Sequence, residues 1–248
     1  MKKYLSIFEL FTRSTIYKIM VILLAMGVSQ VALFYRAMAE WIPLEEYHLE
    51  FEAIDYYSLE WMVDRSKSAE IMAVAFILLT VVLCLNGCNF GSKSSYTLQR
   101  LQVTEKKIFL LQSLYNSLCY VLLLGAQVAV FLIQSKLYID NAGTVTNQSV
   151  FLAFYRQDFM HSVLPLEGIV RWICNIVIVL CCGVSAAVFT YLQRRGKLAW
   201  SLLVVVACVI LGFVQGLESQ MAIFVALLLL PIAGWTAYWH VFQKKEGE

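Results

Sequence analysis

Charged residues are scarce in this sequence. Asp, Glu, Lys and Arg make up 15% of the 248 residues, whereas apolar residues make up 60%. Soluble domains usually carry about 25% charged residues, so the composition excludes an ordinary soluble protein and predicts one embedded in a membrane. The net charge of +2 adds little, because in a membrane protein the position of each charge matters more than the sum.

The long apolar runs also lack ionisable side chains away from their ends. A charge at membrane depth is costly and usually marks an ion path or a proton relay. Arg171, Glu218 and His240 lie near the ends of their runs, and we expect them to be interfacial, with Arg171 reaching towards the membrane surface. The sequence therefore does not predict ion-coupled transport.

Groups that could build a catalytic or metal site are few and scattered. His48, His161 and His240 fall in separate parts of the chain, so they are not expected to share one site. The seven cysteines lie in apolar segments without zinc spacing, and we interpret them as small buried hydrophobic residues. We expect no catalytic residue, metal or cofactor in this chain.

A true phosphate loop is also missing, although Gly91-Ser92-Lys93-Ser94 resembles the end of one. The phosphate loop has the spacing G-x-x-x-x-G-K-[ST] and follows a β-strand. Here Gly87 and Gly91 are four residues apart, Ser92 separates Gly91 from Lys93, and an apolar run precedes them. The sequence therefore predicts no ATP site of its own.

What the sequence does contain is six apolar runs long enough to cross about 30 Å of hydrocarbon as helices. They predict an all-α, polytopic fold with spans at about 19–36, 70–91, 108–134, 171–192, 198–217 and 219–241. The third run is longer than a span needs, so part of it should tilt or leave the membrane. No repeat or linker divides residues 1–248, which predicts a single transmembrane domain.

The distribution of charge predicts the orientation. With both termini inside, the inner segments hold 13 of the 19 basic residues and the outer segments hold 13 of the 17 acidic residues. Basic loops are retained in the cytoplasm. We therefore expect six spans with the N- and C-termini in the cytoplasm.

Residues 1–18 are patterned as an amphipathic helix lying in the inner membrane surface. One face carries apolar side chains and the other polar ones; they are Tyr4, Leu5, Phe8 and Phe11 against Lys2, Ser6, Glu9 and Arg13. A cleaved signal peptide ending near Ala37-Met38-Ala39 is the alternative, but both the leading segment and the apolar run are long for one.

The first outward loop, residues 40–64, holds eight acidic residues and no Lys or Arg. A spacing of three and four predicts a helix with one inner face, formed by Leu44, Tyr47, Phe51, Ile54, Ser58 and Trp61. The loop could be a solvated cap over the bundle, or an acidic vestibule that attracts cationic cargo.

The inner segment between the second and third spans is patterned as a short helix along the membrane. Ser94 or Ser95 can cap it, and Leu98 and Leu101 share a side opposite Arg100. Thr104 followed by Glu105 then indicates a new helix start, with the acid at its positive end.

Together, these features resemble the permease subunit of type-two ATP-binding-cassette exporters, especially bacterial permeases of peptide-antibiotic export or self-immunity. In that family the inner segment follows E-x-x-x-G-T-L-x-x-L-x-x-(S/T)-P-x-(S/T)-R. The stretch SSYTLQRLQVTEKK supplies Thr97, Leu98 and Leu101, then Thr104 and two lysines. The glutamate and glycine before the threonine, and the later proline, are absent from it.

The resemblance implies a function for this segment. It would dock on a separate cytoplasmic ATPase through Thr97, Leu98, Arg100, Leu101, Thr104, Lys106 and Lys107. The chain would pair with a second permease subunit, identical or different, in the bacterial cytoplasmic membrane, among lipid and without a nucleic-acid partner. Gly212 and Gly216, spaced as G-x-x-x-G, are candidates for that contact. ATP hydrolysis in the partner would drive export of an amphipathic peptide or lipid-like substrate. The alternative is a membrane immunity, sensor or regulatory protein that transports nothing.

Overall fold

The computed structural model describes residues 2–39, 58–86, 104–142, 147–166, 168–197, 200–214 and 219–242. Every regular element in these ranges is a helix. The long helices are α1 (Lys2–Ala39), α3 (Ser68–Leu85), α5 (Glu105–Ala142), α8 (Ile169–Arg194) and α10 (Ser219–Ala237), which continues as the π-helix η2 (Tyr238–Phe242). The all-helical prediction is thus confirmed for the described residues.

Five of these helices are long and apolar enough to cross a membrane, and the chain is a multi-pass membrane protein on that evidence. The shorter apolar helix α9 (Ser201–Val214) has 14 residues, or about 21 Å at 1.5 Å per residue. That length is less than the hydrocarbon thickness. The predicted fifth span, 198–217, includes residues at both ends that lie outside the described ranges, so the sixth crossing stays a prediction.

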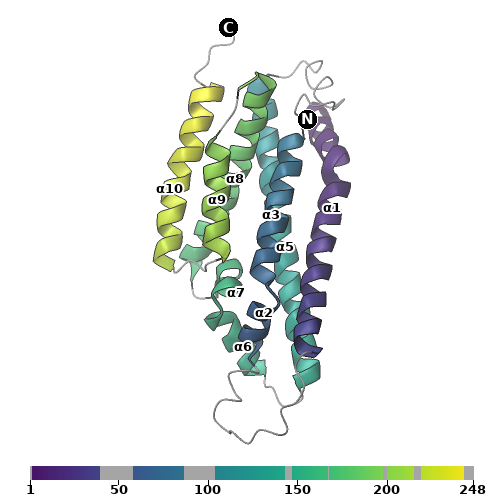
Figure 1. The fold of residues 1–248 in the computed structure, drawn as a ribbon. Coiled ribbons are helices and arrows are strands. Elements are labelled where there is room, and N and C mark those ends of the chain that lie inside the picture. Colours follow the sequence, from purple (N-terminus) through teal and green to yellow (C-terminus); the bar gives the residue numbers. More distant parts are fainter. Residues whose placement is uncertain are drawn as a thin grey trace, which may run out of the picture.

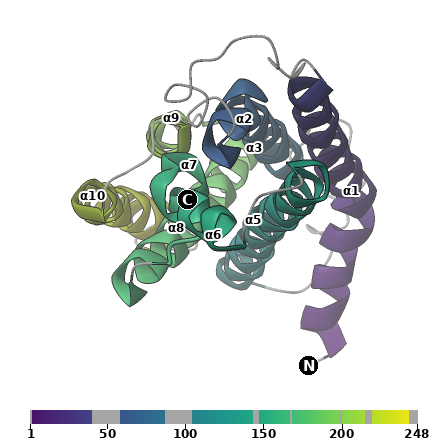
Figure 2. The same cartoon turned by 90° about the horizontal axis from the view of Figure 1, so that it is seen from below.

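With the shorter α9 included, the helices α1, α3, α5, α8, α9 and α10 run alternately up and down the bundle. Figure 1 shows the start of α1 and the end of α10 at one end, which we call the terminal end, and α2, α6 and α7 at the other, the capped end. The view along the bundle in Figure 2 places α5 between α1 and α8, with α9 and α10 beyond α8. α5 therefore joins α1 to the rest of the bundle, and α8, the most buried of the long helices, packs against α3, α5, α9 and α10.

α1 joins two segments that the sequence separates. It continues without a break through residue 18, for 38 residues, or about 57 Å. Ile7 and Phe11 are buried, and Phe8 and Phe11 both contact the ring of Tyr115 on α5. Glu9 and Arg13 are exposed, as the helical wheel predicts. The structure thus agrees with a buried apolar face and an exposed polar face in this segment. The helix does not end at residue 18, however, and the position of the segment at a membrane surface stays a prediction.

The capped end is formed by α2 (Leu59–Arg65), α6 (Asn147–Arg156) and α7 (Asp158–Val163). The side chain of Gln157, between α6 and α7, donates to Asp64 of α2 at 2.8 Å. The prediction of one helix with Ser58 and Trp61 on its inner face is wrong at this end. Ser58 has an extended backbone and caps α2 by accepting from the Trp61 N–H, and the Trp61 side chain is exposed. The earlier part of that loop lies outside the described residues.

α3 ends earlier than the apolar run predicts. Its last residue is Leu85, well before the expected end of the span at 91. Asn86 leaves the helix with ψ of 103°. Its side chain and its carbonyl both accept hydrogen bonds from other helices, which compensates for the lost helical turn.

Polar side chains follow α5 along its buried side and join it to its neighbours. Near the capped end, Gln127 and Gln30 of α1 donate to each other's side-chain oxygens, both at 2.9 Å, and Gln30 also donates to the Ser68 carbonyl. Tyr115 with Thr15 and Tyr120 with Thr80 lie further towards the terminal end, and Gln134 with Ser68 lies closer to the capped end. In an apolar medium such bonds hold helices together.

The Gln30–Gln127 pair gives a testable measure of that effect. Gln127→Leu leaves the buried Gln30 amide without this partner, so we expect a loss of about 1–2 kcal/mol in unfolding free energy. The double variant Gln30→Leu/Gln127→Leu removes both amides and should recover part of the loss. A double-mutant cycle of thermal stability in detergent measures the coupling. Strictly additive losses would contradict a direct interaction.

Candidate functional site

The predicted docking segment is described only at its end. Thr97, Leu98, Arg100 and Leu101 lie outside the described residues. Thr104 precedes α5 and accepts backbone hydrogen bonds from Lys107 at 2.9 Å and from Ile108 at 3.2 Å. This confirms the helix start predicted at Thr104 and Glu105, with the acid in the first turn. Thr104 and Lys107 are exposed and Lys106 is half-buried.

This helix start is tied to the end of α8. Glu105 pairs with Arg195 at 2.5 Å, and the Arg195 guanidinium lies 4.5 Å from the centre of the Tyr191 ring. The two residues are 90 positions apart, so no local spacing in the sequence could reveal the pair. An exposed ion pair contributes little stability, but this one shows that the start of α5 and the end of α8 lie together.

Asn86 is the last described residue before positions 87–103. Residues of four helices meet around it. Ser14 of α1 donates to Asn86 Oδ1 at 2.7 Å. Gln112 of α5 donates through Nε2 to the Asn86 carbonyl at 3.1 Å and to Thr190 Oγ1 of α8 at 2.9 Å. We call these four residues, Ser14, Asn86, Gln112 and Thr190, the polar junction.

Sequence reasoning missed the polar junction. Only Asn86 adjoins the segment that attracted attention, and Gln112 and Thr190 are polar residues within long apolar runs. The available signal was their residue type, because polar groups at membrane depth must find partners. Gln112 and Thr190 are buried at 1% and 0% exposure, and Asn86 is buried too, so the junction reaches from the exposed Ser14 into the interior of the bundle.

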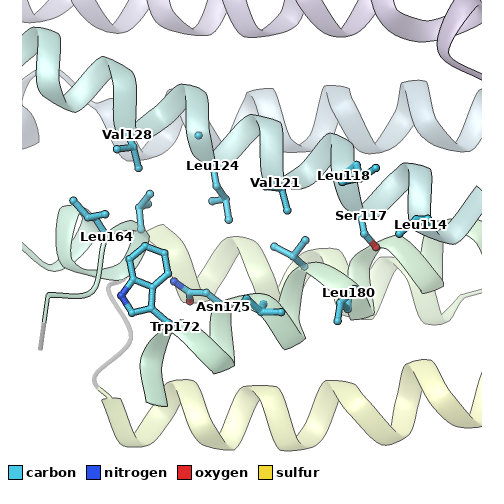
Figure 3. Close-up of a pocket in the computed structure, with 14 residues that line it drawn as sticks. Leu114, Ser117, Leu118, Val121, Leu124, Val128, Leu164, Trp172, Asn175 and Leu180 are labelled. Atoms are coloured by element: carbon cyan, nitrogen blue, oxygen red, sulfur yellow. The ribbon is translucent and has the colours of Figure 1, made fainter. Parts of the chain in front are cut away.

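A cleft of about 470 Å³ opens between α5 and α8. Figure 3 shows α5 side chains such as Val121 and Leu124 on one wall and Trp172 and Asn175 of α8 on the other. The lining is almost wholly apolar, and its polar side chains are Ser117 and Asn175. A volume of this size is typical of small-molecule sites.

Asn175 is held in place from the capped end. Its Nδ2 donates to the Ser162 carbonyl of α7 at 3.0 Å, and Arg171 donates to Ser162 Oγ at 3.1 Å. The expectation that Arg171 reaches out to the membrane surface is wrong, because its side chain is only 4% exposed and packs towards α7. Two further polar residues of the predicted spans do not line the cleft: Gln127 pairs with Gln30, and Gln215 lies outside the described residues.

α5 and α8 approach each other closely at Gly183. A Cβ at this position would lie 2.1 Å from Ser117 Oγ, 2.8 Å from the Ser117 backbone nitrogen and 3.0 Å from the Ser113 carbonyl oxygen. Ala187, one turn further along α8, is fully buried. Small residues therefore permit this contact. The G-x-x-x-G spacing singled out by sequence is elsewhere: Gly212 is buried within this chain and Gly216 is outside the described residues.

The remaining candidate groups do not converge within the described part of the chain. His161 lies in α7 at the capped end and His240 in η2, which continues α10 at the terminal end. The described residues contain no group of three or more His, Cys, Asp or Glu that could hold a metal ion. Comparison of the chain with protein-family models, curated proteins and solved structures found no match.

Proposed function

We propose that this chain is the transmembrane subunit of an ATP-driven exporter, with a cytoplasmic ATPase docked on residues 87–107. In this proposal the chain crosses the bacterial cytoplasmic membrane six times with both termini inside, and it pairs with a second permease subunit. The cargo is an amphipathic peptide or lipid-like molecule.

The anchoring of the proposed docking segment is the observation that supports this function best. The described residues on either side of the segment are tied to other helices. Asn86 is hydrogen-bonded to α1 and α5, and Glu105 is paired with Arg195 at the end of α8. Movement of the segment would therefore reach three other helices as well as α3, as a device that receives force from a partner requires.

The charges at the terminal end also support this orientation. The described residues around the start of α5 and the end of α8 carry one carboxylate, Glu105, and five cations, which are Lys106, Lys107, Arg194, Arg195 and Lys197. Such an excess of Lys and Arg marks cytoplasmic loops. The α5–α8 cleft, apolar except for Ser117 and Asn175, would suit amphipathic cargo.

Charge reversal at the docking segment tests the proposal. When the chain is purified from membranes of its native host, we expect an ATP-hydrolysing subunit to co-purify. Lys106→Glu/Lys107→Glu should abolish that association. The variant places carboxylates on the docking surface, where they would repel the acidic groups of the partner that bind the two lysines in this proposal. The matched control, Arg65→Glu/Lys67→Glu, reverses two cations at the capped end and should retain the ATPase.

Two outcomes would count against the proposal. If the docking variant binds the ATPase as well as wild type, this surface is not the dock. If no ATP hydrolysis accompanies the purified wild-type chain and none is stimulated by candidate peptides in vesicles, the chain is better explained as a non-transporting immunity, sensor or regulatory protein.

A further inference from the structure

A second apolar groove, distinct from the α5–α8 cleft, opens between α3, α8 and α9. It encloses about 360 Å³. Its α3 wall includes Ile77, Val81 and Leu85, and its α9 wall includes Leu203 and Val206. All three of those α3 side chains and Leu203 are exposed, so the groove opens on the surface of the bundle.

The dimensions of the groove match one leaflet of a membrane. From Ile77 to Leu85 it follows α3 for about 12 Å. Half of a hydrocarbon core of roughly 30 Å is about 15 Å. Trp200, which is 71% exposed, and Gln193 lie on its lining where α8 ends and α9 begins. Tryptophan is enriched at the level of lipid headgroups, so this end of the groove has the character of an interface.

The same end is positively charged. The turn that follows Gln193 carries Arg194, Arg195 and Lys197, and the chain returns to the groove at Trp200. Arg195 is paired with Glu105, so the described residues of this turn, counted together with that partner, comprise three cations and one carboxylate. A phosphate placed beside this turn would be attracted by a net charge of +2, whereas a zwitterionic headgroup would gain much less.

We propose that this groove binds an anionic phospholipid, with an acyl chain between α3 and α9 and the phosphate at the α8–α9 turn. The charge complementarity selects the occupant, because the apolar walls alone would accept any lipid. The proposal requires only that the chain spans a membrane and does not depend on an ATPase partner.

Trp200 provides the probe. The full-length chain is placed in nanodiscs of phosphatidylcholine that contain a minor fraction of brominated lipid, which quenches nearby tryptophans. The difference between wild type and Trp200→Phe isolates the Trp200 signal. We expect brominated phosphatidylglycerol to quench Trp200 at a much lower fraction than brominated phosphatidylcholine.

Two variants test the charge and the groove separately. Arg194→Gln/Lys197→Gln should reduce the preference for phosphatidylglycerol by roughly fivefold per charge, whereas the control Arg65→Gln/Lys67→Gln at the capped end should leave it unchanged. Val81→Phe narrows the groove without altering charge and should also reduce the preference.

Three results would overturn the proposal. Equal quenching by the two lipids would mean contact without headgroup selection. Absence of quenching by both would mean that protein covers the groove. A preference that survives Arg194→Gln/Lys197→Gln would place the selecting charge elsewhere.

Discussion

Gly183→Ala should destabilise the protein by about 1–3 kcal/mol, the usual cost of forcing extra volume into a packed interior. The added Cβ would meet Ser117 Oγ, which can rotate away, but also the Ser117 nitrogen and the Ser113 carbonyl, which belong to the backbone of α5. Relief therefore requires the two helices to separate. The decrease in the melting temperature of the variant relative to wild type, measured in detergent, reports the effect.

Matched variants make this result specific. Gly125→Ala on α5 and Gly234→Ala on α10 add the same methyl group where, apart from the adjacent residues and the backbone of the same helix, no atom lies within 4 Å. Because alanine favours a helix over glycine by about 0.5–1 kcal/mol, these two should be neutral or stabilising. Adding Ser117→Ala to Gly183→Ala removes only the hydroxyl contact and should not restore stability. A Gly183→Ala protein as stable as wild type would show that α5 and α8 are not in close contact.

Gln112→Leu should loosen the polar junction and open the end of α3. The substitution keeps a similar apolar volume but removes two donated hydrogen bonds, to the Asn86 carbonyl and to Thr190. At about 1 kcal/mol for each bond, local opening should rise by roughly a factor of 30. Hydrogen exchange of peptides that cover residues 80–86 reports that opening directly.

The control for this variant is Gln134→Leu, the same substitution on the same helix towards the capped end. Gln134 donates to Ser68 at the start of α3, so exchange should rise there and not at residues 80–86. If the proposed function holds, Gln112→Leu should also retain the ATPase but lose transport driven by it. Equal exchange at residues 80–86 in both variants would refute the junction as the local anchor.

The sequence predicts the helices of this protein better than it predicts their contacts. Apolar runs and the Thr104–Glu105 start gave α5 and α8 close to their observed places, because length and hydrophobicity decide whether a helix can span a membrane. The end of α3 was misplaced, because Asn86 leaves the helix to bond with residues distant in the chain. No local pattern contains that information.

In the candidate site, too, the residue types were visible in the sequence but their contacts were not. Asn175 is a polar residue within a predicted span, and the structure places it on the wall of the cleft. Arg171 was expected at the membrane surface, because arginine at a span end usually extends outward. Instead, Ser162 of α7 offers an acceptor inside the bundle. The contact at Gly183 was also missed, since its partner Ser117 lies on a helix that a single sequence does not pair with α8.

The position of α5 between α1 and α8 has a consequence for how the protein is made. Chains are synthesised from the N-terminus, and polar residues weaken the insertion of a helix into lipid. Gln127 and Gln134 find their partners in α1 and at the start of α3, which precede α5 in synthesis. We expect α5 to insert next to α1 and α3, which are already in the membrane. Its contacts with Gly183 and Thr190 form only after α8 has been inserted. Biogenesis would then proceed in two steps, with α1, α3 and α5 assembling first.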